Sequence, residues 1–255
     1  MARIPAALKG LLAGLIDYAG LYPPAALPLP AVTEKYRDYL SSPESWMLNR
    51  LILPAASLAE ARLPADWRVS LLVEEDPGPL PRPVETLETR LAHGLSLPTY
   101  CEAPVERIAG AFAKVRMGGV TPEAIPSVEQ AADFLRGAAA LRLPFKATAG
   151  LHHPIRSLRP LTYAPDGPRA VMHGFVNFFV AAAFAWHGME GEALIEVLRE
   201  EDPRAFEFGD VWLRWRGRPL TTAQVEAARR DFAHSFGSCS FEEPVSGLRA
   251  LGLLP

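Results

Sequence analysis

The stretch FKATAGLHH, residues 145–153, shows the pattern that decides the fold, a short apolar run that ends in glycine and polar side chains. Seven further segments combine a short apolar run with a charged or glycine-rich end. They are LID at 15–17, LNRLILPA at 48–55, RVSLLVEE at 68–75, VETLETRL at 84–91, LPTYCEA at 97–103, AFAKVRMGG at 111–119 and FGSCSFEE at 236–243. Apolar runs of this length between turn signals are typical of strands buried on both faces, as in a parallel sheet. The sequence therefore predicts eight such strands.

Helical patterns separate several of these strands. The clearest begins with a capping box, in which the side chains of Ser127 and Gln130 cap each other's backbone N–H groups, and it places Ala131 and Leu135 on one face. The other helical segments are residues 30–40, 170–187, 192–200 and 222–233. Strands that alternate with helices favour an irregular (β/α)8 TIM-type barrel in which residues 1–255 form a single domain.

Two features depart from a regular barrel. The connections from the third to the fifth strand are too short for full helices, and residues 154–235 form a long helical insertion before the last strand. This insertion could be a lid, an oligomer contact, or ordinary barrel helices with an extra hairpin around residues 206–220. An open, doubly wound α/β sheet is the alternative fold.

Composition and charge limit the class of protein. With 255 residues and 49% hydrophobic residues, the chain can bury a core without disulfide or metal staples. A formal net charge of −3 gives no electrostatic footprint for nucleic acid or an anionic membrane. The apolar run at 175–186 is interrupted by Asn177 and is too short to span a bilayer. Because the only cysteines, Cys101 and Cys239, fit a reducing compartment, we expect a cytoplasmic protein with a small-molecule substrate, compatible with a homo-oligomer.

Charged and polar side chains follow the apolar runs at the point where each predicted strand ends. In a TIM-type barrel the carboxyl ends of the strands meet at one face, where the active sites of this fold lie. Buried charges need partners, which favours a single site over a set of unrelated charges on the rim. The candidates for proton transfer and nucleophilic attack are Asp17, Glu88, Glu102, Lys114, Lys146, His152 and His153.

Lys114 and Lys146 are the most specific of these candidates. Only four of the 26 basic residues are lysines, and these two end neighbouring predicted strands. Two ammonium groups held close repel each other and burial disfavours their charged form, so both effects lower a lysine pKa. A neutral lysine amine can attack a carbonyl carbon to form a Schiff base, whereas arginine keeps its proton. The alternative is that each lysine is a plain cation that holds a carboxylate or phosphate, or pairs with a rim glutamate.

Two segments resemble a known enzyme family. KATAGLHHPIR at 146–156 and FGSCS at 236–240 are similar to the last two strands of deoxyribose-phosphate aldolase, a class I aldolase. The resemblance implies that Lys114 forms a Schiff base and that Lys146 lowers its pKa. The chain departs from the family at 114–119, where KVRMGG stands in place of Lys-Thr-Ser-Thr-Gly, and in an inserted HHP. The resemblance further implies a phosphate site in the serine loop formed by Gly237, Ser238 and Ser240. The same loop also fits a capping box at the start of the last helix.

Other residues are candidates for binding the anionic end of a substrate. Arg116 with Gly118 and Gly119 places a cation beside backbone that a ligand can approach closely, although the same residues could form a tight turn. His173 and Asn177 are four residues apart on the most apolar helix, so they share a face and either line the pocket or satisfy each other. The full candidate set is Arg116, Gly118, Gly119, Thr148, His173, Asn177, Gly237, Ser238 and Ser240.

The adjacent histidines His152 and His153 follow the seventh predicted strand. Neighbouring side chains on a loop usually point in different directions, so one of them could act alone as a general acid or base. A metal site would instead need one of these histidines with Glu88, Glu102 or His173. Because no HxH or HExxH spacing is present, we expect no metal cofactor, with a divalent metal as the alternative.

These observations lead to one expected function and two alternatives. We expect an aldolase- or lyase-like enzyme that acts on a small oxo compound carrying phosphate or carboxylate, through a Schiff base on Lys114. The first alternative is a metal-assisted lyase, isomerase or hydrolase. The second is a non-catalytic protein that uses the barrel to hold a small anion.

Overall fold

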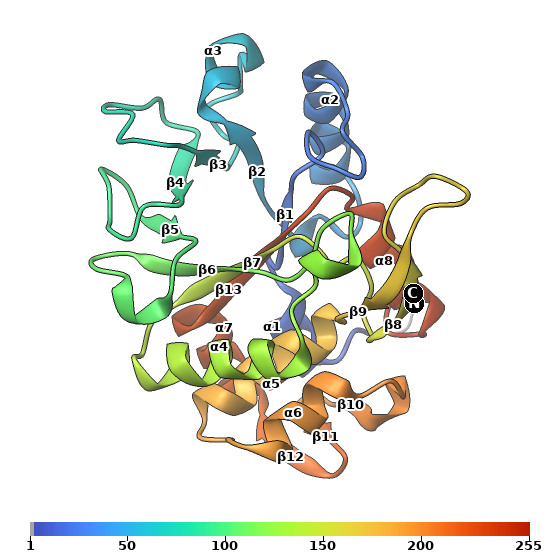
Figure 1. Cartoon of the computed structure of the whole chain (residues 1–255). Helices are drawn as coiled ribbons and strands as arrows, with labels where there is room; N and C mark the ends of the chain where they lie inside the picture. The colour runs from blue at the N-terminus through green and yellow to red at the C-terminus, as the bar shows by residue number, and fades with distance from the viewer. Residues whose placement is uncertain (1–2) are drawn as a thin grey trace.

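A closed barrel of eight parallel strands forms the centre of the molecule (Figure 1). The computed structural model describes residues 3–255. Around the barrel the order is β1, β2, β3, β4, β5, β6, β7 and β13, and β13 pairs with β1 to close the ring. Each of the eight predicted segments overlaps one of these strands, so the TIM-type barrel is confirmed and the open sheet is wrong. The strands are β1 (Ile16–Tyr18), β2 (Leu48–Pro54), β3 (Val69–Leu72), β4 (Val84–Thr89), β5 (Thr99–Cys101), β6 (Phe112–Arg116), β7 (Phe145–Thr148) and β13 (Ala233–Ser238).

The helices are unevenly distributed around the barrel. Within the described residues, no α-helix connects β3 to β4 or β4 to β5, and a single 3-10 turn at Val105–Arg107 lies between β5 and β6. The predicted gaps are therefore confirmed, as is the capping box of Ser127 and Gln130 at the start of α4. The α-helices are α1 (Ala6–Leu12), α2 (Leu29–Leu40), α3 (Leu58–Ala61), α4 (Val128–Ala140), α5 (Phe175–Trp186), α6 (Glu192–Arg199), α7 (Thr222–Asp231) and α8 (Glu242–Ala250).

The long segment between β7 and β13 holds three helices and two small sheets. Figure 1 shows α4, α5 and α6 grouped on one side of the barrel. Phe175 of α5 stacks on Phe236 of β13 with 5.4 Å between ring centroids, so α5 is an ordinary barrel helix. The hairpin predicted around residues 206–220 is found as part of a three-stranded sheet. The additional strands are β8 (Ser157–Pro160), β9 (Arg169–Met172), β10 (Phe206–Phe208), β11 (Trp212–Trp215) and β12 (Arg218–Thr221).

The barrel has an apolar outside and a polar inside. Side chains alternate across a strand, so Phe145 packs outward against Phe178 of α5, while the next residue, Lys146, points into the barrel. Asp17 and Glu88 join Lys146 inside and are almost completely buried. Charges in this position cost folding free energy unless they are paired, which marks the barrel interior as the place to look for function. No helix within residues 3–255 has both the length and the hydropathy of a transmembrane span.

Candidate active site

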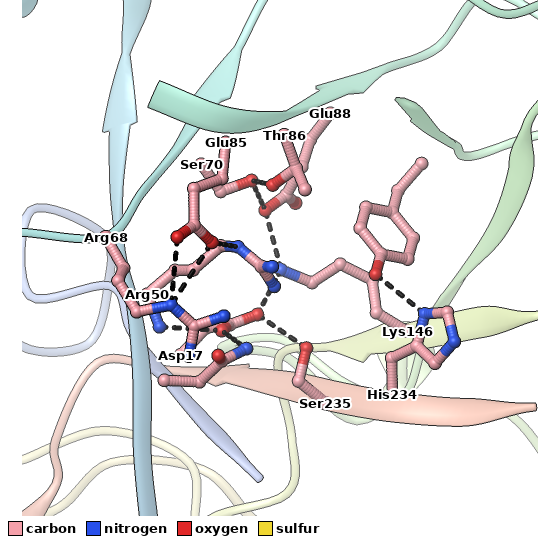
Figure 2. A network of polar contacts seen from close by, with 12 residues as sticks. Asp17, Arg50, Arg68, Ser70, Glu85, Thr86, Glu88, Lys146, His234 and Ser235 are labelled. Carbon is pink, nitrogen blue, oxygen red and sulfur yellow. Dashed lines mark hydrogen bonds and ion pairs between the residues drawn. The ribbon is translucent and has the colours of Figure 1, made fainter. Parts of the chain in front are cut away.

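The two lysines lie side by side, as predicted from the sequence. Lys114 of β6 and Lys146 of β7 are direct neighbours in the strand register. Lys146 Nζ donates to Asp17 Oδ2 at 2.5 Å and to Glu88 Oε1 at 2.6 Å (Figure 2). Lys114 Nζ lies 2.9 Å from the other oxygen of the same carboxylate, Glu88 Oε2. Glu88 therefore bridges the two amines.

The bridge holds the two lysines differently. Lys146 makes two directed hydrogen bonds, whereas Glu88 Oε2 accepts no hydrogen bond of acceptable angle among the described residues. The Lys114 contact is thus an ion pair without a directed bond, and its amine is the less constrained of the two. This difference suits a division of labour in which Lys146 is fixed and Lys114 reacts.

The neighbouring carboxylates of Asp17 and Glu88 keep Lys146 positively charged. Burial lowers the pKa of Lys146, but Asp17 and Glu88 raise it by more, so the net shift is upward. Burial likewise raises the pKa of the Glu88 carboxyl, and the two lysines outweigh it and hold that pKa far below its ordinary range. The predicted lowering of the pKa is wrong for Lys146, because the sequence pattern does not reveal that two carboxylates flank it. Lys146 is a permanent cation at neutral pH.

A shell of hydrogen bonds orients both carboxylates. Asp17 Oδ1 accepts from Asn49 Nδ2 at 2.7 Å and from the Arg50 backbone N–H at 3.1 Å, and Asp17 Oδ2 accepts from Ser235 Oγ at 2.7 Å. Glu88 Oε1 accepts from Ser70 Oγ at 2.8 Å. These donors stand on β2, β3 and β13, so the barrel wall itself preorganises the site.

Two adjoining cavities open above the buried ion pairs at the carboxyl ends of the strands. Their volumes are about 410 Å³ and about 600 Å³, which suits a small molecule. Lys114 lines both cavities, and Lys146 lines neither. A ligand in this space can reach the amine of Lys114 only. The side chains common to both cavities are Tyr22, Leu72, Glu88, Arg90, Lys114 and Arg116.

The cations at the cavity mouth differ in their availability. Arg116 Nε donates to Glu102 Oε1 at 3.0 Å, and Glu102 Oε2 lies 3.7 Å from Lys114 Nζ, so the predicted anion-binding arginine already has a carboxylate. Arg90, which sequence reasoning missed, is exposed and has no ion pair or hydrogen bond among residues 3–255. Arg90 could have been found from the sequence because it lies two residues after Glu88, and side chains two residues apart lie on the same side of an extended chain.

Tyr22 is a second residue that was not among the candidates. Its hydroxyl is buried and has no hydrogen-bond partner within the described part of the chain. Burial, together with Glu88, raises the pKa of Tyr22 to about 12, so the phenol keeps its proton. A buried donor without an acceptor costs about 1–3 kcal/mol. A substrate oxygen in either cavity would supply the missing acceptor.

The two histidines have different partners, although both line a third, smaller cavity beside the first two. His152 Nδ1 lies 2.7 Å from Glu243 Oε2, and the ring lines the cavity of about 410 Å³. His153 lines a smaller neighbouring cavity, and burial with Arg159 nearby lowers its pKa to about 4. Across residues 3–255, no three His, Cys, Asp or Glu side chains are grouped so that they could hold a metal ion, and this includes the predicted histidine–carboxylate combinations.

The remaining candidates divide between the cavity wall and the scaffold. Thr148, Gly119 and Gly237 line the cavity of about 410 Å³. Gly118 instead packs closely on Gly150, where a Cβ on Gly118 would lie 2.7 Å from the Gly150 Cα. Gly118 therefore allows close packing against Gly150 and does not line the cavity in which the anion site was predicted.

The predicted serine loop and the polar residues His173 and Asn177 satisfy local hydrogen bonds. The prediction that His173 and Asn177 share a helix face is wrong, because residues 169–172 form β9 and α5 begins only at Phe175. Ser238 Oγ donates to the Ser240 carbonyl at 2.7 Å, and Ser240 Oγ accepts from the Glu243 backbone N–H at 3.1 Å. The reciprocal half of the predicted capping box is not formed, because the Ser240 N–H donates to Ser238 Oγ and the Glu243 carboxylate contacts His152. His173 Nε2 lies 2.8 Å from the Pro126 carbonyl, and Asn177 Nδ2 donates to the Glu200 carbonyl at 2.8 Å. None of these four side chains lines the two cavities around Lys114.

The free energy of unfolding is expected to fall as the pH drops from about 6.5 towards about 4. Burial, with a nearby arginine in each case, lowers the pKa of both His153 and His234 to about 4. Their unfolded forms bind protons below about pH 6.5, so the stability from the neutral rings is complete above that pH and is lost on acidification. Urea unfolding of the wild type and a His234→Gln variant at pH 7 and pH 5 measures this slope. A wild-type stability that is equal at both pH values would contradict the prediction.

No protein-family model, no curated protein and no solved structure matches this chain.

Proposed function

We propose that this chain is an aldolase- or lyase-like enzyme that forms a Schiff base between Lys114 and a small oxo compound. The observation that carries the proposal is the pair of lysines bridged by Glu88. Lys146 is buried as a cation, whereas Lys114 lines both cavities. A lysine that lies beside a second, fixed cation and lines a small-molecule cavity is the arrangement that imine chemistry uses. Lys146 also contacts Glu88, so the negative charge of this carboxylate is shared between the two lysines.

The proposed reaction uses the groups around Lys114 in sequence. The neutral amine attacks the carbonyl carbon and a C–N bond forms. The carbonyl oxygen takes one proton from that nitrogen and one from a nearby acid and leaves as water, which gives the protonated imine. The protonated imine then accepts the electron pair of the neighbouring C–C bond, which breaks to give an enamine and an aldehyde once a base removes the proton of the β-hydroxyl group. Glu102, 3.7 Å from Lys114 Nζ, and His152, held by Glu243, are the proposed proton carriers.

Arg90 is the proposed site for the anionic end of the substrate. It is a cation on the wall of both cavities without a carboxylate partner in residues 3–255, whereas Arg116 is paired with Glu102. A guanidinium group binds carboxylate or phosphate through two parallel hydrogen bonds. The substrate class is therefore a small oxo acid or phosphorylated oxo compound.

Borohydride trapping tests the proposal. The protein is incubated with a panel of small aldehydes, ketones and oxo acids, reduced, digested and analysed by mass spectrometry. We expect an irreversible adduct on the peptide that contains Lys114 and none on the peptide that contains Lys146, which lines neither cavity. The exposed Lys35 reports background reaction. Labelling of Lys35 that equals or exceeds that of Lys114 with every compound sinks the imine mechanism.

Replacement of Tyr22 by phenylalanine is expected to slow trapping at Lys114 by about 10²-fold, because the phenol would no longer donate to the carbonyl oxygen that leaves as water. Stability should be unchanged or higher, since the hydroxyl has no partner among the described residues. Tyr18→Phe is the matched control, because the Tyr18 hydroxyl is equally buried and unpaired there but lines neither cavity. Equal trapping rates for the wild type and Tyr22→Phe would remove Tyr22 from the mechanism.

A further inference from the structure

A separate chamber opens at the opposite mouth of the barrel, at the amino ends of the strands. Its volume is about 580 Å³, and its walls come from the beginnings of β2, β4, β5, β6 and β13 and from α7. This end of a TIM barrel ordinarily serves stability, so a cavity of this size lined by Arg50, Arg229 and Arg230 calls for a reason. The side chains that matter below are Arg50, Tyr100, Phe112, Arg229 and His234.

Arg229 contributes a buried positive charge that forms no ion pair within the described residues. Its guanidinium donates to the carbonyls of Leu11 at 2.7 Å, Ala13 at 3.1 Å and His234 at 2.6 Å, and also to that of Ala233. All of these acceptors are neutral, and no acidic side chain pairs with Arg229 among residues 3–255. Burial lowers its pKa to about 10, and the charge of Asp17, which acts in the opposite direction without pairing with the guanidinium, offsets this only in part. An anion in the chamber would compensate this charge.

Arg50 adds a second cation to the same wall. Its Nε donates to Glu85 Oε2 at 2.9 Å, and its two terminal nitrogens have no partner among the described residues, although the side chain is only 15% exposed. Figure 2 shows Arg50 next to Glu85, which also binds Arg68. A mostly buried guanidinium with an open edge is suited to a carboxylate or phosphate, which it binds with two parallel bonds.

The other walls of the chamber suit a small organic molecule. The rings of Tyr100 and Phe112 lie 5.3 Å apart, and Tyr100 Oη is 2.8 Å from His234 Nδ1. Because the pKa of His234 is lowered to about 4, the ring is neutral and polar at pH 7. The acidic side chains that line the chamber are Glu85, which is already shared by two arginines, and Glu226.

We propose that this chamber binds a small organic anion whose carboxylate or phosphate group contacts Arg50 and compensates Arg229. The layer of Asp17, Lys146 and Glu88 lies between it and the cavities around Lys114, so an anion bound in the chamber does not reach the Lys114 amine. The connection is short, since the backbone N–H of Arg50 holds Asp17 in place. This inference does not depend on the Schiff-base chemistry.

Calorimetric titration with inorganic phosphate and with malonate, at an ionic strength fixed with sodium chloride, tests the proposal and separates the two anion types. We expect at least one probe to bind the wild type with a dissociation constant in the millimolar range or tighter. The Arg90→Gln variant, which lacks the proposed substrate-anion site at the other mouth, should still bind at least one probe, and adding Arg50→Gln to it should weaken that binding at least tenfold. If neither probe binds, or if Arg90→Gln alone abolishes binding, the chamber is not an anion site.

A second variant guards against misfolding caused by the loss of the Arg50–Glu85 pair. Ala13 is exposed on the chamber wall, and only its backbone carbonyl takes part in the Arg229 contacts. Ala13→Trp should block the chamber and reduce probe affinity at least tenfold while the thermal unfolding midpoint without probe stays at the wild-type value. Wild-type affinity in a folded Ala13→Trp protein would place the bound anion elsewhere and overturn the proposal.

Discussion

A Lys146→Met variant is expected to lose about 3–5 kcal/mol of folding free energy, a large fraction of the stability of a domain. Lys146 Nζ contacts both Asp17 and Glu88, and all three side chains are about 1% exposed. Methionine has a similar length but no charge, so the variant leaves two carboxylates in the barrel interior with Lys114 as their nearest remaining amine. Removing one partner of a buried ion pair costs more than the pair itself contributes, because the other charge stays desolvated.

Urea unfolding monitored by circular dichroism measures this loss. The control is Lys35→Met, which breaks the ion pair with Glu242 at the surface, where both side chains are about half exposed. Pairs of this kind contribute about 0–1 kcal/mol, so the control should unfold almost as the wild type does. Equal midpoints for the two variants would mean that Lys146 does not neutralise the barrel interior, and the division of labour between the two lysines would then have no basis.

Much of the barrel could be predicted because its signal is local. A strand buried on both faces must be a short apolar run, and a polar end must follow where the chain reaches the rim, so each of the eight segments carries its own evidence. The neighbourhood of Lys114 and Lys146 follows from the same reasoning, since consecutive strands of this fold are adjacent. Lysine is scarce in this arginine-rich chain, so a lysine at the end of a buried strand is a specific indication of function.

The properties of the site were less predictable because they depend on residues far apart in the chain. Asp17 and Glu88 come from β1 and β4, and only their convergence on Lys146 raises the pKa of that amine. Arg90 matters because Arg116 is already paired, which no local pattern reveals. Helix-capping serines have the same residue types as a phosphate loop, so the sequence alone could not separate the two.

Replacement of Lys114 by arginine is expected to lower the turnover of any substrate that traps on the wild type by at least about 10⁴-fold. Arginine keeps a positive charge beside Glu88 and Glu102, so the fold and the charge balance of the cavity should survive. It cannot supply a neutral nitrogen at ordinary pH, so no imine forms. Retention of substrate binding by Lys114→Arg, measured by calorimetry, would show that the variant has lost the chemical step and not the binding site. Turnover within tenfold of the wild type would rule out the Schiff base, and a wild type that binds the same compounds without converting them would instead be a small-anion binding protein.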